Sequence, residues 1–167
     1  MNKRTAIILG SDSDLAIAEK SMNVFKKLGI NYEAHIISAH RTPERAREFA
    51  LNAKKNNFGV IIAIAGKAAH LAGVLAACTR LPVIGVPVKS DDLGGLDALL
   101  STVQMPSGVP VSCVAINGGE NAAWLAARIL AVSDEELAEK LEHESQIMAE
   151  NVNHKDKILQ EKMNREQ

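Results

Sequence analysis

Short apolar segments alternate with helix-like segments along most of this chain, and this alternation constrains its fold more than any other feature. Five segments have the length and apolar character of β-strands, namely 5–9, 32–37, 60–65, 82–86 and 111–116. Helix-like runs follow them, at 15–28, 43–55, 68–79, 95–103 and 121–132. Strands that are apolar on both faces and alternate with helices are typical of a parallel sheet covered on both sides. The sequence therefore predicts an α/β fold, a three-layer αβα sandwich around a central parallel sheet, flavodoxin-like or Rossmann-like.

The C-terminal segment has a different pattern from the rest of the chain. From about residue 134 to 163 it is helix-like and highly charged. Leu137, Met148 and Leu159 recur every eleven residues, as do Leu141, Val152 and Met163. This repeat corresponds to about 3.67 residues per turn and keeps an apolar stripe on one face of a long, nearly straight helix. We therefore divide the chain into a single α/β domain, 1–132, and a helical extension, 133–167. The stripe favours packing on a neighbouring subunit, and a solvated tail is the alternative.

Composition and charge argue against several classes of function. The formal net charge is -1 and the chain has three Phe, one Trp and one Tyr, which favours neither nucleic-acid nor membrane-surface binding. No apolar stretch reaches membrane-spanning length and no signal-peptide core is present, so we expect a cytoplasmic protein. Cys78 and Cys113 lie in apolar surroundings without zinc-type spacing. They are interpreted as small core residues, and no metal site is predicted.

Three polar loops follow the first three predicted strands, at 10–14, 38–43 and 66–73. Because parallel strands end at one edge of a sheet, where open α/β sheets bind their ligands, these loops can form one pocket. The second loop carries His40 and Arg41, a titratable imidazole beside a permanent cation. This pair suits an anionic substrate that gains and loses protons.

The first and third loops allow more than one interpretation. Ser11 and Asp14 belong to a run of polar residues that could bind an anion, hold sugar hydroxyls or simply cap the next helix. The third loop combines small residues, which let a flat ligand approach the backbone, with His70 in the first turn of the predicted helix. Lys67 could attract a carboxylate or a phosphate, or be a solvated side chain.

The remaining loops and histidines receive no catalytic role. Proline-containing segments 86–92 and 104–110 are interpreted as rigid walls or subunit contacts, or as simple ends of elements. His35 is expected inside the second strand, and His143 and His154 on the charged C-terminal helix.

Taken in order, the loop motifs resemble those of the PurE family of purine biosynthesis. They are Gly-Ser-Asp-Ser-Asp at 10–14, Ser-Ala-His-Arg-Thr-Pro at 38–43, Ala-Ala-His-Leu at 68–71, Pro-Val-Ile-Gly-Val-Pro-Val at 82–88 and Gln-Met-Pro-Ser-Gly-Val-Pro-Val at 104–111. The resemblance covers about residues 5–132. It implies a homo-octamer that converts N5-carboxyaminoimidazole ribonucleotide to 4-carboxy-5-aminoimidazole ribonucleotide without metal or organic cofactor, on the route to inosine monophosphate.

The resemblance also implies roles for individual residues. His40 matches the general acid/base, and His70 matches a second, supporting histidine. Groups around the substrate phosphate are implied at Ser11, Ser38 and Arg41, and Asp14 matches the acceptor for ribose hydroxyls. Walls around the imidazole ring and a trapped carbon dioxide are implied at Ala65, Gly66, Ala68 and Leu71. These small and apolar residues suit a dry cage for carbon dioxide.

One position departs from the family pattern. The mutase branch usually carries Gly-Gly before Ala-Ala-His-Leu, and this chain has Lys67 as the second residue. The related branch that carboxylates aminoimidazole ribonucleotide directly usually has a basic residue there, but it lacks His at position 70 and usually has Lys at position 41. The balance favours the mutase, with Lys67 near the substrate carboxylate or at the rim of the pocket. The alternatives are a direct carboxylase and a nucleotide-binding module without turnover.

Overall fold

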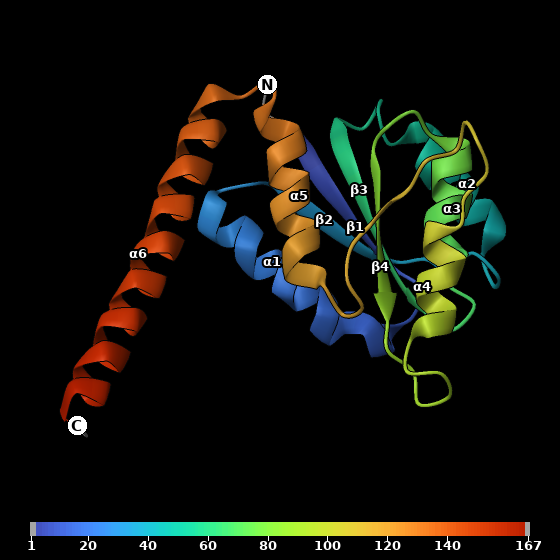
Figure 1. Cartoon of the computed structure of the whole chain (residues 1–167). Coiled ribbons are helices and arrows are strands. Elements are labelled where there is room, and N and C mark those ends of the chain that lie inside the picture. The colour runs from blue at the N-terminus through green and yellow to red at the C-terminus, as the bar shows by residue number, and fades with distance from the viewer. Residues whose placement is uncertain (1–2, 166–167) are drawn as a thin grey trace.

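A computed structural model describes residues 3–165, and the sheet at its centre has five parallel strands in the order β2-β1-β3-β4-β5. The strands are β1 (Arg4–Leu9), β2 (Tyr32–Ile36), β3 (Phe58–Gly66), β4 (Val83–Val88) and β5 (Ser112–Cys113). Helices cover both faces (Figure 1). The predicted three-layer αβα sandwich is thereby confirmed. Residues 1–2 and 166–167, the outer ends of the two predicted units, lie outside the described residues.

The helices form two layers with separate cores. One layer contains α1 (Leu15–Leu28) and α5 (Gly119–Ala131), and the other contains α2 (Pro43–Asn52), α3 (Leu71–Cys78) and α4 (Leu96–Val103), as Figure 1 shows. Side chains of β1 and β3 alternate between the two cores, with Ile7 and Ile62 on the α1/α5 side and Ile8 and Ile61 on the α2/α3 side. These strands are buried on both faces, which explains their continuous apolar sequences.

The strand order places a topological switch between β1 and β3. The chain passes from β1 outward to β2, then returns across the sheet to β3 and continues to β4 and β5. In doubly wound sheets the loops after the strands diverge at this point and leave a crevice at the carboxyl edge. The sequence-predicted loops after β1, β2 and β3 all lie at that edge.

Several element boundaries differ from the prediction, among them the fifth strand and the start of the third helix. The fifth strand spans two residues instead of six, because Pro110 cannot donate a backbone hydrogen bond and Asn117, at φ 60°, turns the chain back toward Pro87. The helix expected from Ala68 begins at Leu71, because Lys67 at φ 53° cannot continue into a right-handed helix. His70 therefore occupies the N-cap position and not the first turn.

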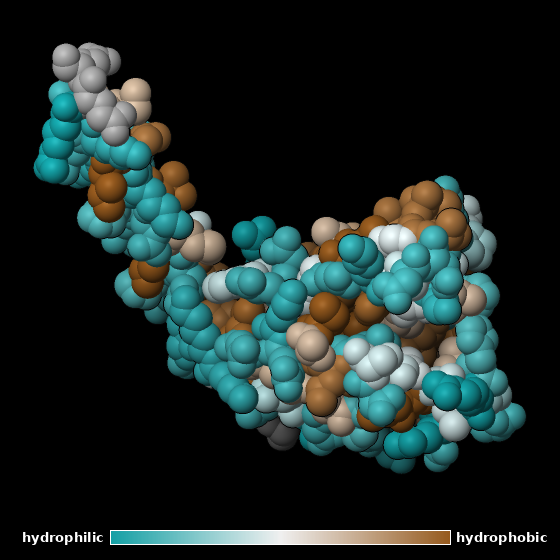
Figure 2. Space-filling model, turned by 90° about the horizontal axis from the view of Figure 1, so that it is seen from below, coloured by the Kyte–Doolittle hydropathy of each residue, from teal (hydrophilic) through white to brown (hydrophobic). Residues whose placement is uncertain are grey.

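The C-terminal segment forms one continuous helix, α6 (Glu135–Arg165). Its first turns pack on the domain: Leu137 is buried, and Lys27 of α1 forms an ion pair with the buried Glu144. Beyond these contacts the helix projects away from the sandwich (Figure 1), and apolar side chains show as separate patches along it (Figure 2). Met148, Val152 and Leu159, all from the predicted stripe, are exposed. Among the described helices, none has the length and apolar character needed to cross a membrane.

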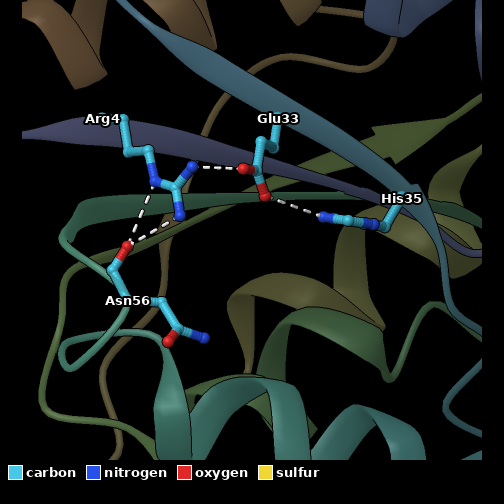
Figure 3. Close-up of polar contacts among 4 residues, drawn as sticks. All are labelled: Arg4, Glu33, His35 and Asn56. Atoms are coloured by element: carbon cyan, nitrogen blue, oxygen red, sulfur yellow. Dashed lines mark hydrogen bonds and ion pairs between the residues drawn. The ribbon is translucent and has the colours of Figure 1, made fainter.

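The opposite, amino-terminal edge of the sheet is held by a polar cluster around Arg4 (Figure 3). Its guanidinium donates to the Asn56 carbonyl oxygen at 2.9 and 3.1 Å, forms an ion pair with Glu33 and lies 4.4 Å from the centre of the Phe58 ring. Glu33 also contacts His35 Nε2 at 3.3 Å. These contacts join β1, β2 and the turn before β3, so His35 has the structural position expected of it.

Helix α5 crosses α1 at Gly119, and we predict that Gly119→Ala destabilises the fold. A Cβ atom built at this position would lie 2.2 Å from the backbone oxygen of Ile17. The backbone must move to relieve that overlap, and the buried 2.6 Å hydrogen bond from the Ser21 hydroxyl to the Gly119 carbonyl would weaken. Urea unfolding should show a loss of about 1–3 kcal/mol. Asn121→Ala, an exposed position on the same helix, serves as control, and an equal loss there would contradict this explanation.

Candidate active site

A cleft of about 770 Å³ opens at the carboxyl edge of the sheet. It is lined by residues from the loops that follow β1, β2, β3 and β4: Gly10, Ser11, Ser13, Asp14, Ser38, Ala39, His40, Arg41, Ala65, Gly66, Lys67, Ala68, Leu71, Val88, Lys89, Ser90, Asp91 and Asp92. Nine of the ten sequence-predicted site residues are in this set, and the tenth, His70, contacts His40. The expectation that three loops share one pocket is therefore confirmed by the geometry.

In the loop after β1, the Ser11 side chain caps a helical turn, whereas the Asp14 carboxylate makes no capping contact. Ser11 Oγ accepts a hydrogen bond from the Ser13 backbone N–H at 3.3 Å and thereby caps a short 3-10 turn, Asp12–Asp14. Asp14 occupies the N-cap position of α1, but its side chain makes no capping hydrogen bond. It is 6% exposed, and burial raises the pKa of this carboxyl, while the Ser13 hydroxyl 3.3 Å away partly offsets the rise. Capping thus accounts for Ser11 but not for Asp14.

The loop after β2 is a closed turn that displays His40 and Arg41. The Thr42 N–H donates to the Ser38 carbonyl at 2.8 Å, and the Ser38 N–H donates to the Thr42 hydroxyl oxygen at 3.1 Å. The Ser38 hydroxyl oxygen accepts from the Arg41 N–H at 3.2 Å. Pro43 then starts α2, with its fixed φ in the first turn. The side chains of His40 and Arg41 are left exposed at the cleft, where Arg41 can meet an anion.

His40 and His70 form a hydrogen-bonded pair at the cleft. His40 Nε2 lies 3.0 Å from His70 Nδ1, and the two rings are edge to face, with centroids 5.1 Å apart. One imidazole donates and the other accepts, so this bond is incompatible with both rings carrying a full positive charge. The contact fixes the orientation of His40 and gives its proton a second basic site. His70 itself does not line the cleft; it supports His40.

The loop after β3 gives the cleft a small, apolar floor. Ala65, Gly66 and Ala68 line it, and a Cβ atom built on Gly10 of the neighbouring loop would lie 3.4 Å from the Ala65 Cβ. The two loops therefore pack against each other at this point. Leu71, 3% exposed and at the start of α3, closes the floor with an apolar side chain.

The loop after β4 also lines the cleft, which agrees with one interpretation of segment 86–92, a rigid wall, although none of its residues was predicted as a site residue. β4 continues to Val88, and residues 89–92 then form part of the wall. Asn117 Oδ1 accepts a 2.9 Å hydrogen bond from the Lys89 N–H and so holds the beginning of this loop. The signal was present in the sequence, because a fourth parallel strand ends at the same edge as the other three. Segment 104–110 does not line the cleft.

The two cysteines lie outside the cleft and are unpaired and half-buried, less buried than expected. Burial raises the pKa of the Cys113 thiol, which disfavours the reactive thiolate. Among the described residues, no group of three or more His, Cys, Asp or Glu side chains is arranged to hold a metal ion.

Together, the strand order and the loops define a flavodoxin-like α/β protein with a ligand cleft at the topological switch and a histidine pair beside it. Residues 4–151 match the family described as AIR carboxylase, and the chain belongs to that family. It is 57% identical to the N5-carboxyaminoimidazole ribonucleotide mutase of Pyrococcus horikoshii over 81% of this chain and 76% of that one. It is 52% identical to the enzyme of the same name from Thermotoga maritima, over 87% and 85% of the chains. The crystal structure of Treponema denticola PurE superposes with a TM-score of 0.85 at 32% identity, covering 92% and 96% of the chains.

We predict that Asp14→Asn stabilises the fold at neutral pH while it weakens substrate binding. The folded-state pKa of Asp14 is raised, so ionisation of this carboxyl is less favourable in the folded protein than in the unfolded chain. The stability advantage of the variant should be constant well above that pKa. It should shrink as the pH falls through the raised folded value toward 3.8, the ordinary value. Thermal unfolding of both proteins from pH 7 to pH 4 measures this difference in stability. A stability advantage of Asp14→Asn that grew on acidification would contradict the raised pKa.

Proposed function

We propose that this protein is an N5-carboxyaminoimidazole ribonucleotide mutase of purine biosynthesis, an isomerase that moves the carboxylate of its substrate from N5 to C4. The relatives that carry this name are more than half identical to the chain and align over most of its length. The observation that carries the assignment is the His40–His70 hydrogen bond, 3.0 Å long, beside a cleft with both anion-binding and apolar walls. This enzyme acts in the cytoplasm, where nucleotide synthesis takes place.

The two ends of the cleft suit the two ends of such a substrate. Arg41, beside Ser38, offers a permanent cation and a hydroxyl for the phosphate. Ser11 lies in the adjoining loop and adds a third polar group. The buried Asp14 carboxylate, which caps no helix, accepts hydrogen bonds from ribose hydroxyls. The imidazole ring then extends toward the floor formed by Ala65, Gly66, Ala68 and Leu71.

The reaction moves one carboxylate and exchanges one proton at each of two ring positions. The N5–carboxylate bond breaks, N5 takes up a proton, and carbon dioxide is released into the apolar pocket. C4 then attacks carbon dioxide and loses its own proton. His40 can supply the first proton and accept the second, so the imidazole ends in the state in which it began. Small apolar walls hold carbon dioxide near C4 without offering it a nucleophile or water.

The hydrogen bond to His70 makes His40 suitable for both steps. The bond to His70 Nδ1 engages His40 Nε2 and holds the ring in one orientation, which leaves His40 Nδ1 as the nitrogen that exchanges protons with the substrate. In this role His70 is a positioning residue, and its loss should reduce turnover less than the loss of His40.

We predict that His40→Asn lowers kcat for N5-carboxyaminoimidazole ribonucleotide by about 10²–10⁴-fold, while substrate binding is largely retained. Asparagine keeps a hydrogen-bonding side chain but cannot exchange a proton near neutral pH. His143→Asn on α6 is the matched control, since His143 is an exposed histidine outside the cleft. Retained turnover in His40→Asn would refute the mechanism and favour a binding module without catalysis.

The same assay distinguishes the direct carboxylase. Wild-type protein is supplied separately with N5-carboxyaminoimidazole ribonucleotide and with aminoimidazole ribonucleotide plus bicarbonate. A mutase forms the C4-carboxylated product rapidly from the first substrate. Rapid product formation only from the second pair would replace the mutase assignment with the carboxylase.

The active enzyme is a homo-oligomer, an octamer by resemblance to the family, in which α6 packs on a neighbouring subunit. Support comes from the position of the apolar stripe. Leu137 is buried against this chain's own domain, whereas Met148, Val152 and Leu159 continue the stripe without cover. Within the described part of the extension, residues 133–165, the contacts with the domain 1–132 of the same chain come from the first turns of α6.

We predict that replacing Met148, Val152 and Leu159 together with serine dissociates the assembly, because the uncovered part of the stripe loses three apolar side chains. Because an α-helix turns by about 100° per residue, Glu150, Lys157 and Glu161 lie on the face opposite the stripe. Replacement of these three residues together with serine is the control. Light scattering measures the mass in solution. An unchanged mass for the stripe variant would contradict a bridging role for α6.

A further inference from the structure

An ion pair joins two loops across the mouth of the cleft. Lys67, after β3, and Asp92, after β4, both line the cleft, and Lys67 Nζ lies 2.8 Å from Asp92 Oδ2. Both side chains are largely exposed, at 71% and 63%. An ion pair so open to water adds little to folding stability. Its effect must be sought in the charge that it places at the cleft.

Fixed charges of the two signs are balanced among the residues that line the cleft. The basic side chains, His40 aside, are Arg41, Lys67 and Lys89, and the carboxylates are Asp14, Asp91 and Asp92. Lys67 lies among the acidic side chains of the β4–α4 segment, since Asp92, Asp97 and Asp91 all raise its pKa, Asp92 by hydrogen bond and charge most of all. Without Lys67, the wall after β4 would present uncompensated negative charge to the cleft.

The backbone at this position does not favour lysine. Lys67 has a φ of 53°, in the left-handed region that glycine adopts most readily. Glycine would therefore relieve backbone strain, and it would remove only an exposed ion pair. Neither the backbone conformation nor the stability gained from the ion pair accounts for a lysine at this position. The positive charge that the lysine places beside the acidic wall of the cleft does account for it.

We propose that Lys67 is a specificity-determining positioning residue that neutralises Asp92 and so admits a ribonucleotide whose base carries a carboxylate. This inference rests on the proposed function for the orientation of the substrate. With the phosphate at Arg41 and the ring over Ala65–Ala68, the carboxylate arrives on the side of the cleft that holds the Lys67–Asp92 pair. There an unneutralised Asp92 would repel it.

Four proteins test the proposal: wild type, Lys67→Gly, Asp92→Asn and the double variant. Lys67→Gly should raise KM for N5-carboxyaminoimidazole ribonucleotide by about 5-fold, the effect of one charge a few ångströms away in a wet site, with kcat changed by less than about 2-fold. Asp92→Asn should lower KM, and the double variant should return it to within about 2-fold of wild type. A double variant as impaired as Lys67→Gly would overturn the charge-compensation mechanism.

Binding measurements separate this inference from the proposed function. In Lys67→Gly, the Kd should rise more for 4-carboxy-5-aminoimidazole ribonucleotide than for aminoimidazole ribonucleotide, which lacks the carboxylate. The difference should diminish in high salt, because salt screens exposed charges. If wild type failed to convert the mutase substrate, the proposed function would fall, yet these Kd values would still decide the role of Lys67. Equal Kd changes for the two ligands, or none, would overturn it.

A structural role for Lys67 predicts a different result. Thermal unfolding of Lys67→Gly should show an unchanged or raised midpoint, because strain is relieved as the exposed pair is lost. A lowered midpoint together with the raised KM would identify Lys67 as a structural residue and overturn the proposal. Lys140→Ala is the matched control: Lys140 forms a similar 2.7 Å exposed pair with Glu136, and neither residue lines the cleft.

Discussion

The pairing of β1 with β3 is the constraint on which the rest of the site depends. The two strands run in continuous parallel register from Thr5 opposite Val60 to Leu9 opposite Ile64, and both are buried on both faces. Backbone pairing continues past the strand, with the Gly10 N–H donating to the Ile64 carbonyl at 2.9 Å. The loops that diverge after these strands therefore start from a fixed base, and the distance between them is set by the sheet itself.

The histidine pair illustrates how that base is used. His40 follows β2 and His70 follows β3, and β1 lies between these two strands. Neighbouring strands are about 4.8 Å apart, so the strands that precede the two histidines are about 10 Å apart. The side chains of His40 and His70 span this distance past the end of β1, where Gly10 lies. A Cβ atom built on Gly10 would lie 3.4 Å from the Ala65 Cβ, in ordinary van der Waals contact, so the loops after β1 and β3 pack directly against each other there.

Much of the fold and of the site could be predicted from the sequence, because strong apolar strands and the parallel-edge rule are local or general signals. The positions of Ser38, His40 and Arg41 as neighbours at one edge of the sheet follow from such signals. The start of α3 could not be predicted, because nothing in the sequence indicates that Lys67 adopts φ 53°. The contact between His40 and His70 depends on that turn, so spacing alone could not reveal it. Segment 86–92 was interpreted as a rigid wall, a subunit contact or a simple end of a strand, because Pro87 fits all three, and the fold shows that residues 89–92 form a wall of the cleft.

Three residues of the cleft depart from local rules of stability, and the departures share one character. Asp14 is a buried carboxylate without a capping role, and Lys67 is a lysine in a backbone conformation that favours glycine. The Ser90 hydroxyl, on the wall after β4, is buried without a hydrogen-bond partner among the described residues. Each places a polar group where folding gains little from it. Groups of this kind are expected where a ligand supplies the missing interaction. A polar substrate that bound Asp14 and Ser90 and required the charge of Lys67 would compensate all three at once.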